Sequence, residues 1–243
     1  AVVTVISTTG SSAAKAGAKA LIDSEGRTLL GWVGGGCVEN QLRETALDCL
    51  KSGQPTKMTV DLMDELTSVP CGGTMDLLFE PVLPPPHLQL IGHGRVVESL
   101  CKFGRFLGFR VTIFDAQAIP EVFPQADHLY PDDPALTRLV GGSHSFAVVA
   151  THHKWDHLAL EVCLKKQVGY IGLIASQHRT HLIMKTLSER GWYPGDLNCI
   201  KAPAGLHLSA KTPEEIALSI MGEVVGVYRK GAPLHSNEVP TTA

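Results

Sequence analysis

The sequence lacks several features that would each assign it to a class. Its 243 residues carry 21 basic and 24 acidic side chains, so there is no basic excess to neutralise a nucleic-acid backbone. No apolar stretch approaches the roughly 20 residues of a membrane-spanning helix. The chain opens on a β-type run without the charged start of a signal peptide. We therefore expect a soluble, cytoplasmic protein, or one with an upstream piece missing, that binds neither nucleic acid nor membrane.

Six cysteines are present, but no two form a CxxC pair. Neither a disulfide framework nor a structural zinc site is therefore predicted, and a reducing compartment fits best. Glycines flank two of these cysteines, Cys37 and Cys71. The other four lie within apolar helical or strand-like patterns, and we expect each of them in the core: Cys49, Cys101, Cys163 and Cys199.

The first part of the chain has the alternation of β-structure. Strands are predicted over residues 1–8, 18–23 and 28–33, the last two as a hairpin. Apolar residues then recur at helical spacing from Val38 to Leu50, which predicts a helix that Gly53 ends. Two more strands follow over residues 57–62 and 75–82. These elements predict a small N-terminal α+β domain over residues 1–83.

Pro84-Pro85-Pro86 marks a domain boundary, because consecutive prolines continue neither a helix nor a strand ladder. Beyond it, strands over 88–91, 110–114, 146–150 and 169–174 alternate with helices over 96–106 and 155–166. This order predicts an α/β fold, a Rossmann-like doubly wound parallel sheet over residues 87–230. Helices over 177–190 and 213–229 follow, the second with Thr212 as N-cap and Glu215 at the capping-box position. Residues 231–243 are predicted to form a flexible tail.

Gly34-Gly35-Gly36-Cys37-Val38-Glu39 places a thiol where a strand gives way to the first turn of a helix. Backbone N–H groups and the helix dipole favour the thiolate there, which is the nucleophilic and metal-binding form. The glycines let the backbone approach an anionic or bulky ligand. Cys71-Gly72-Gly73 repeats this arrangement on a loop. The alternative interpretation is a tight turn followed by a cysteine that only packs.

Ser11, Ser12, Lys15 and Lys19 follow the first strand and offer hydroxyl and ammonium groups to an anion. The Gly-Lys-Ser/Thr ending of a P-loop is absent, and a solvated turn is the alternative interpretation.

Two features of the second part point to a ligand. Gly92-His93-Gly94 lies between a strand and a helix, and Asp115 ends the next strand, which is the arrangement of a dinucleotide site. Val97 stands where the third glycine of that motif belongs, so a nucleotide or a pterin-type ligand both stay open. His152 and Asp156 follow another buried strand at its carboxyl end, where open α/β sheets bind ligands.

Taken together and in this order, the motifs resemble the XdhC/CoxI family of accessory factors for xanthine dehydrogenase and related molybdenum hydroxylases. The strongest pieces are residues 35–39, residues 71–73 with Glu80-Pro81, and residues 92–96. Residues 151–156, 170–172, 203–206 and 212–220 also fit. The chain departs from the family pattern at Ala16, His93, Arg95 and Ala175, so the ligand of the Rossmann-like part stays open.

The resemblance implies a factor that binds molybdenum cofactor, supports its sulfuration by a cysteine desulfurase and inserts it into an apo-hydroxylase. It implies Cys37 as the leading functional residue, either a molybdenum ligand or a sulfur carrier, because a soft thiolate suits both roles. Cys71 is the second such residue. The full predicted cofactor-binding set is Ser11, Ser12, Lys15, Gly34, Gly35, Gly36, Cys37, Glu39, Gly72, Gly73, Gly92, Gly94, Asp115, His152 and Asp156.

Two other functions remain open at this stage. One is an NAD(P)-dependent oxidoreductase built on the Rossmann-like part, with His152 or His153 as acid/base. The other is an interaction module that docks an enzyme while its cysteines stay inert. For the oligomeric state, a homodimer is the expectation.

Overall fold

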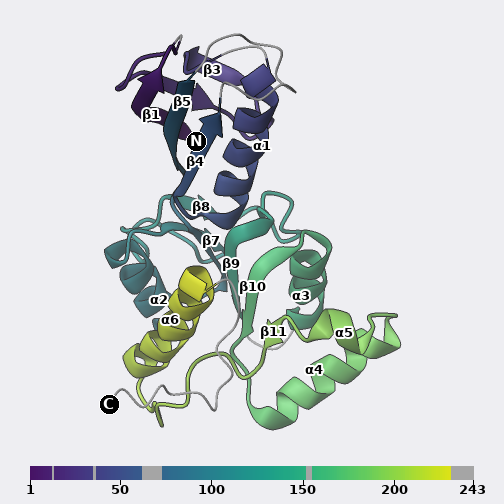
Figure 1. Ribbon diagram of the computed structural model, residues 1–243. Helices are drawn as coiled ribbons and strands as arrows, with labels where there is room; N and C mark the ends of the chain where they lie inside the picture. The colour runs from purple at the N-terminus through teal and green to yellow at the C-terminus, as the bar shows by residue number, and fades with distance from the viewer. Residues whose placement is uncertain (13, 35–36, 62–72, 152–154, 231–243) are drawn as a thin grey trace, which may run out of the picture. The chain divides into compact units, whose positions relative to one another are not determined.

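The computed structural model describes residues 1–12, 14–34, 37–61, 73–151 and 155–230. The chain divides into two compact units, Ala1–Pro84 and Pro85–Ala243. The described helices include none that is long and apolar enough to cross a membrane. Each unit is built around its own sheet (Figure 1).

The first unit is a five-stranded antiparallel sheet with one helix packed on it. Its strands lie in the order β3-β2-β1-β5-β4, and they are β1 (Val2–Gly10), β2 (Lys19–Ile22), β3 (Thr28–Gly31), β4 (Thr56–Asp61) and β5 (Gly73–Glu80). The predicted hairpin is confirmed, because β2 pairs antiparallel with β3. Alternate residues of β1 and β5 are buried, which gives the sheet one apolar face.

The helix α1 (Cys37–Ser52) covers that apolar face. Val38, Leu42, Ala46 and Cys49 recur every three or four residues, so they share one side of the helix. All four are buried in the same core as the inward-facing residues of β1 and β5. Gly53, at φ 66°, ends the helix as predicted.

The second unit is a six-stranded parallel sheet in the order β11-β10-β9-β6-β7-β8. Its strands are β6 (His87–Gly92), β7 (Arg110–Phe114), β8 (His128–Tyr130), β9 (Gly142–Ala150), β10 (Val168–Leu173) and β11 (Ile200–Lys201). The chain proceeds from β6 outward in one direction and from β9 outward in the other. This is a doubly wound sheet whose strand order reverses between β6 and β9, the point at which open α/β sheets place their ligands.

Helices cover both faces of this sheet (Figure 1). One face carries α2 (Arg95–Phe106) and α6 (Pro213–Lys230), which share one apolar core. The other face carries α3 (Asp156–Lys165) and α4 (Gln177–Glu189), and the short helix α5 (Pro194–Leu197) precedes β11. The α/β fold class is confirmed. The capping box of α6 is also present, since Glu215 Oε2 accepts from Thr212 N at 3.0 Å and Glu215 N donates to Thr212 Oγ1 at 3.2 Å.

Three elements were not expected from the sequence, namely β8, β11 and α5. They contain three, two and four residues, which is too short for a periodic apolar pattern to show. The prediction that four cysteines lie in the core is right for Cys49, Cys101 and Cys163 and wrong for Cys199, which is exposed. Cys199 follows α5 in a surface turn, where its thiol bonds the Asp196 carbonyl oxygen at 3.0 Å.

Candidate functional site

In the first unit, several of the predicted residues gather at one end of the sheet. The last residue of β1, Gly10, pairs with Gly73, the first residue of β5. A Cβ on Gly73 would lie 2.3 Å from the carbonyl oxygen of Thr9 and 2.9 Å from that of Ser11. Only glycine therefore fits at position 73, and the backbone of β5 lies directly against the loop that carries Ser11.

The segment leading into α1 reaches the same end of the sheet. Gly34 has a left-handed backbone, φ 141°, and a Cβ placed on it would lie 3.6 Å from Met75 Cε. Because Gly34 precedes the helix start at Cys37 by three residues, the amino end of α1 lies near the start of β5. Glu39, in the first turn of α1, is exposed.

The hydroxyl and ammonium groups predicted to meet an anion differ in their surroundings. Ser12 is buried and its hydroxyl donates to the Ala14 carbonyl oxygen at 2.8 Å, so it stabilises the turn. Ser11 and Lys15 are exposed. The predictions for Gly35, Gly36, Cys71, Gly72 and His152, and for the side chain of Cys37, fall outside the described part of the chain.

In the second unit, the glycine turn lies at the point where the strand order reverses. Gly92 ends β6 beside Ala150 of β9, and a Cβ on Gly92 would lie 2.4 Å from the Ala150 carbonyl oxygen. Its φ of 125° also requires glycine. Gly94 is the N-cap of α2, and no side chain caps the helix there. The structure thus brings the predicted Gly92 and Gly94 to the position where a Rossmann sheet holds phosphate.

The acidic residue expected to bind ribose hydroxyls already has partners. Asp115 Oδ2 lies 3.0 Å from Nδ1 of His93, and Asp115 Oδ1 accepts the backbone N–H of Gln117 at 2.8 Å. Val97, in place of the third glycine, is buried in the core between α2 and the sheet. A dinucleotide bound in the usual way would have to replace the contact between His93 and Asp115.

Asp156 belongs to a buried polar network at the carboxyl end of β9. Its side chain is 3% exposed; Oδ1 accepts from the Thr151 hydroxyl and Oδ2 from Arg179 Nη2 of α4. Arg179 Nη2 also reaches the Thr151 carbonyl oxygen at 3.3 Å. Burial raises the pKa of the Asp156 carboxyl, and the hydrogen bond from Thr151 opposes that rise. Asp156 therefore acts on any ligand by positioning Arg179.

A second buried carboxylate was not among the predicted site residues. Glu223 of α6 is 5% exposed, and its Oε2 accepts from the Tyr170 hydroxyl at 2.6 Å and from the Gly205 N–H at 2.9 Å. Burial and the neighbouring negative charge of Glu223 raise the pKa of Tyr170 well above its ordinary value. The only sequence signal was a glutamate on the apolar side of a predicted helix, and nothing in the sequence named its partners.

Among the described residues, no group of three or more His, Cys, Asp or Glu side chains is placed to hold a metal ion. Donors for an organic anion are present instead, in both units: glycine-lined helix starts, hydroxyls and the Arg179 guanidinium. These features define a two-part α/β protein with a glycine-lined loop end in the first part and a Rossmann-type ligand edge in the second.

Comparison with known families agrees with this class and narrows it. Residues 88–224 match the model of the XdhC Rossmann domain, and residues 1–62 match that of the XdhC and CoxI family. The chain therefore belongs to the XdhC and CoxI family, as its motifs indicated.

Three curated relatives are similar to it. YqeB of Escherichia coli K12, an uncharacterized protein, is 29% identical over 226 residues, covering 89% of this chain and 41% of the relative. A protein of Bacillus subtilis 168, named as a probable xanthine dehydrogenase component, is 30% identical over 165 residues, covering 65% and 48%. The molybdenum cofactor insertion chaperone PaoD of Escherichia coli K12 is 24% identical over 263 residues, covering 93% and 82%. The chain thus spans less than half the length of the first two relatives.

A solved structure shares the fold. The crystal structure of a xanthine dehydrogenase from Bacillus halodurans matches 99% of this chain and 93% of its own, with a TM-score of 0.53 and 23% sequence identity. At this identity the likeness concerns the fold alone.

Proposed function

We propose that this chain is an accessory factor for a molybdenum hydroxylase of the xanthine dehydrogenase type. In this role it binds molybdenum cofactor, supports the exchange of an oxo ligand for sulfur by a cysteine desulfurase, and inserts the cofactor into the apo-enzyme. It carries the cofactor and does not turn over a small metabolite. Family membership supports the proposal, and so does its similarity to a protein named as a cofactor insertion chaperone.

The observation that carries the proposal is the meeting of β1, β5 and the start of α1. Gly73 and Gly34 leave backbone exposed where larger residues would fill the space, and the exposed Lys15 and Ser11 follow β1 at the same end. These groups suit a phosphate-bearing pterin, because N–H, hydroxyl and ammonium donors bind phosphate oxygens. Cys37, at the start of α1, would supply a thiolate to molybdenum or to the transferred sulfur.

The cofactor, when bound, supplies the molybdenum centre at which the sulfur is installed. The chain's own residues bind its phosphate, orient the pterin and present the Cys37 thiol. A helix start favours the ionised form of that thiol through the N–H groups and the dipole. The rival interpretation, an NAD(P)-dependent oxidoreductase, is less well supported because Asp115 is already bonded to His93 and Val97 fills the third glycine position.

The test compares Cys37→Ala with Cys199→Ala, a matched control at an exposed cysteine in the other unit. Each protein is isolated from cells that make molybdenum cofactor, and its molybdenum and pterin contents are measured. We expect the wild type and Cys199→Ala to retain cofactor and Cys37→Ala to lose it while its circular dichroism and thermal midpoint are unchanged. Retention by Cys37→Ala at the wild-type level would remove the role given to Cys37.

Two further measurements separate the alternatives. Tight NADH binding with hydride transfer to an added carbonyl compound would favour the oxidoreductase. Full rescue of hydroxylase maturation by a variant lacking both Cys37 and Cys71 would favour a docking module with inert cysteines. Light scattering on the purified protein tests the expected homodimer.

A further inference from the structure

Three sequence motifs that the proposed function leaves unused line or support one cavity of the second unit. They are residues 170–172, 203–206 and 212–220, and they lie far apart along the chain. The cavity has a volume of about 560 Å³, within the range of about 300–1,000 Å³ that small-molecule sites occupy. Its walls come from the residues after β10, the loop between β11 and α6, and the first turns of α4 and α6.

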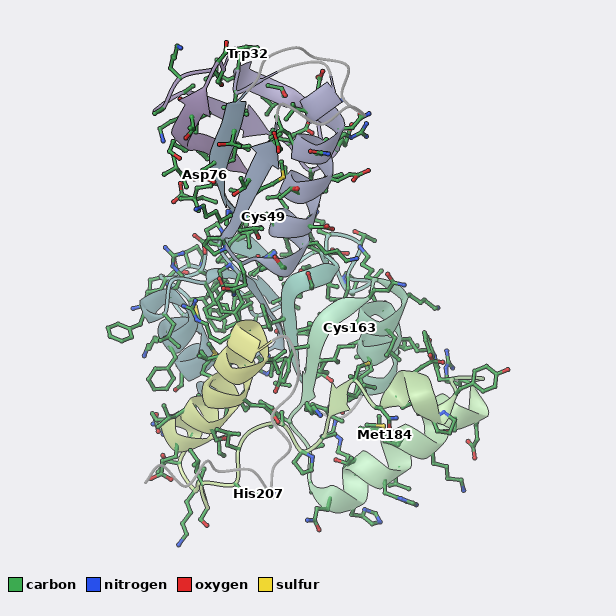
Figure 2. The ribbon with its side chains drawn as sticks, viewed as in Figure 1. Trp32, Cys49, Asp76, Cys163, Met184 and His207 are labelled. Carbon is green, nitrogen blue, oxygen red and sulfur yellow. The ribbon has the colours of Figure 1, made fainter. Side chains whose placement is uncertain are left out.

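The cavity lies at the carboxyl end of the parallel sheet. Ile174 follows β10 directly, and Ser176 is the N-cap of α4. The loop from β11 to α6, on which Figure 2 labels His207, forms the opposite wall. This is the end of the sheet at which doubly wound folds bind ligands. The cavity is separate from the glycine turn at Gly92, because it is built on β10 and β11 and not on β6.

The loop wall is held in a fixed conformation. Gly205, at φ 106°, donates its N–H to the buried Glu223, and a Cβ on it would lie 2.4 Å from Ser219 Oγ of α6. A Cβ on Gly172 would lie 3.1 Å from the Cβ of Ala204. The loop therefore packs directly on β10 and α6, and a carboxylate buried in α6 anchors it. Such a preformed wall lowers the entropic cost of binding a ligand.

The chemistry of the lining is mixed, with one permanent charge. Ile174, Leu206 and Ile216 supply apolar surface, and Ser176 and Ser209 supply hydroxyl-bearing side chains. Arg179 is the one arginine in the described lining, which contains no lysine and no carboxylate. An apolar surface beside an isolated cation suits a ligand with a flat heterocyclic body and an anionic group.

Arg179 is positioned to receive that anion. Its side chain is 18% exposed, and its Nη2 is fixed by Asp156 and by the Thr151 carbonyl oxygen. Its Nε and Nη1 make no hydrogen bond to any residue that the structure describes. A guanidinium fixed at one nitrogen keeps its remaining N–H donors in a rigid plane, which favours two-point contact with phosphate oxygens.

We infer that this cavity binds a phosphate monoester carried on an aromatic heterocycle, with Arg179 as the phosphate ligand and Asp156 as the residue that positions it. A nucleoside monophosphate and a pterin phosphate share this chemistry. The inference goes beyond the proposed function, since the site uses no cysteine and a nucleotide would occupy it as well as a pterin.

The experiment measures binding of four probes to the full chain by titration calorimetry: neopterin monophosphate, neopterin, AMP and adenosine. We expect at least one phosphorylated probe to bind, and its phosphate-free counterpart to bind at least about tenfold more weakly, the loss expected for a charge-assisted hydrogen bond. Tighter binding of neopterin monophosphate identifies a pterin as the source of the phosphate, and tighter binding of AMP identifies a nucleotide.

Two variants test the residues. Arg179→Met combined with Asp156→Asn removes the cation without leaving a buried carboxylate unpaired, and Ala210→Trp fills the cavity without touching that pair. Each should weaken binding at least about tenfold. Arg190→Met is the matched control, because Arg190 also pairs with a carboxylate, that of Glu161, but lies outside the cavity. It should bind the probes as the wild type does.

The inference is overturned if neither phosphorylated probe binds the wild type, or if both cavity variants, once folded, bind like Arg190→Met. Cys37→Ala separates this result from the proposed function. We expect it to bind the phosphorylated probe with wild-type affinity even where it retains no molybdenum cofactor.

Discussion

Replacing Tyr170 with phenylalanine removes one hydroxyl from the interior of the second unit and leaves the ring in place. That hydroxyl donates to Glu223 Oε2 at 2.6 Å, and the Glu223 side chain is 5% exposed. After the change, Oε2 keeps only the N–H of Gly205, at 2.9 Å. A hydrogen bond to a charged group contributes about 1.5–3 kcal/mol, and a buried acceptor left without it cannot turn to water. We expect Tyr170→Phe to lower the free energy of unfolding by about 2 kcal/mol.

The assay is urea denaturation followed by circular dichroism, with Tyr228→Phe as the matched control. Tyr228 packs its ring against Phe109 and Phe146 at centroid distances of 5.9 and 6.0 Å, and its hydroxyl makes no hydrogen bond to a described residue. Removing it should change the unfolding free energy by less than about 0.5 kcal/mol. Combining Tyr170→Phe with Glu223→Gln should cost less than the sum of the two single changes, by about 1 kcal/mol. Equal stability of Tyr170→Phe and Tyr228→Phe would refute the reasoning.

Three other outcomes follow from the described contacts. Gly92→Ala should cost about 3 kcal/mol or more, because its Cβ would lie 2.4 Å from a backbone oxygen, whereas Gly108→Ala, with φ 82° and nothing within 4 Å, should cost only about 1–2 kcal/mol of backbone strain; urea denaturation compares them. Burial lowers the pKa of His87 from 6.5 to about 4, so the unfolded chain takes up the proton first as the pH falls. Stability present above about pH 6.5 should therefore fall by about 1–2 kcal/mol between about pH 7 and about pH 5, and His87→Gln should reduce that loss. Mass-spectrometric mapping after alkylation should find Cys199 modified and Cys163 protected, because burial raises the pKa of Cys163 to about 12.

Each of these three results has a contrary outcome. Equal costs for the two glycine variants would show that the strand contact at Gly92 can relax. A pH dependence that His87→Gln leaves unchanged would assign the acid loss to other groups. Alkylation of Cys163 at the rate of Cys199 in folded protein would mean that α3 opens readily.

The two-part α/β plan could be predicted from the sequence because its signals are local. Apolar residues at a spacing of three or four predicted α1, and the proline run at residues 84–86 stands where the two compact units divide. The capping box at Thr212 was also legible, since its two partners lie three residues apart. Short edge strands such as β8 gave no signal, because three residues next to a loop take their conformation from the neighbouring strand.

The site divides along the same line. The sequence by itself determined which positions must be glycine-lined turns, which helices begin where, and, through the order of its motifs, the family. Only the tertiary structure decided that Asp115 is bonded to His93, that Asp156 positions Arg179, and that Glu223 anchors the loop around Gly205. The partners in these contacts lie about 20 residues apart, and they meet only because parallel strands bring their carboxyl ends to one edge of the sheet. Composition and periodicity describe single elements, whereas a site is made from the ends of several.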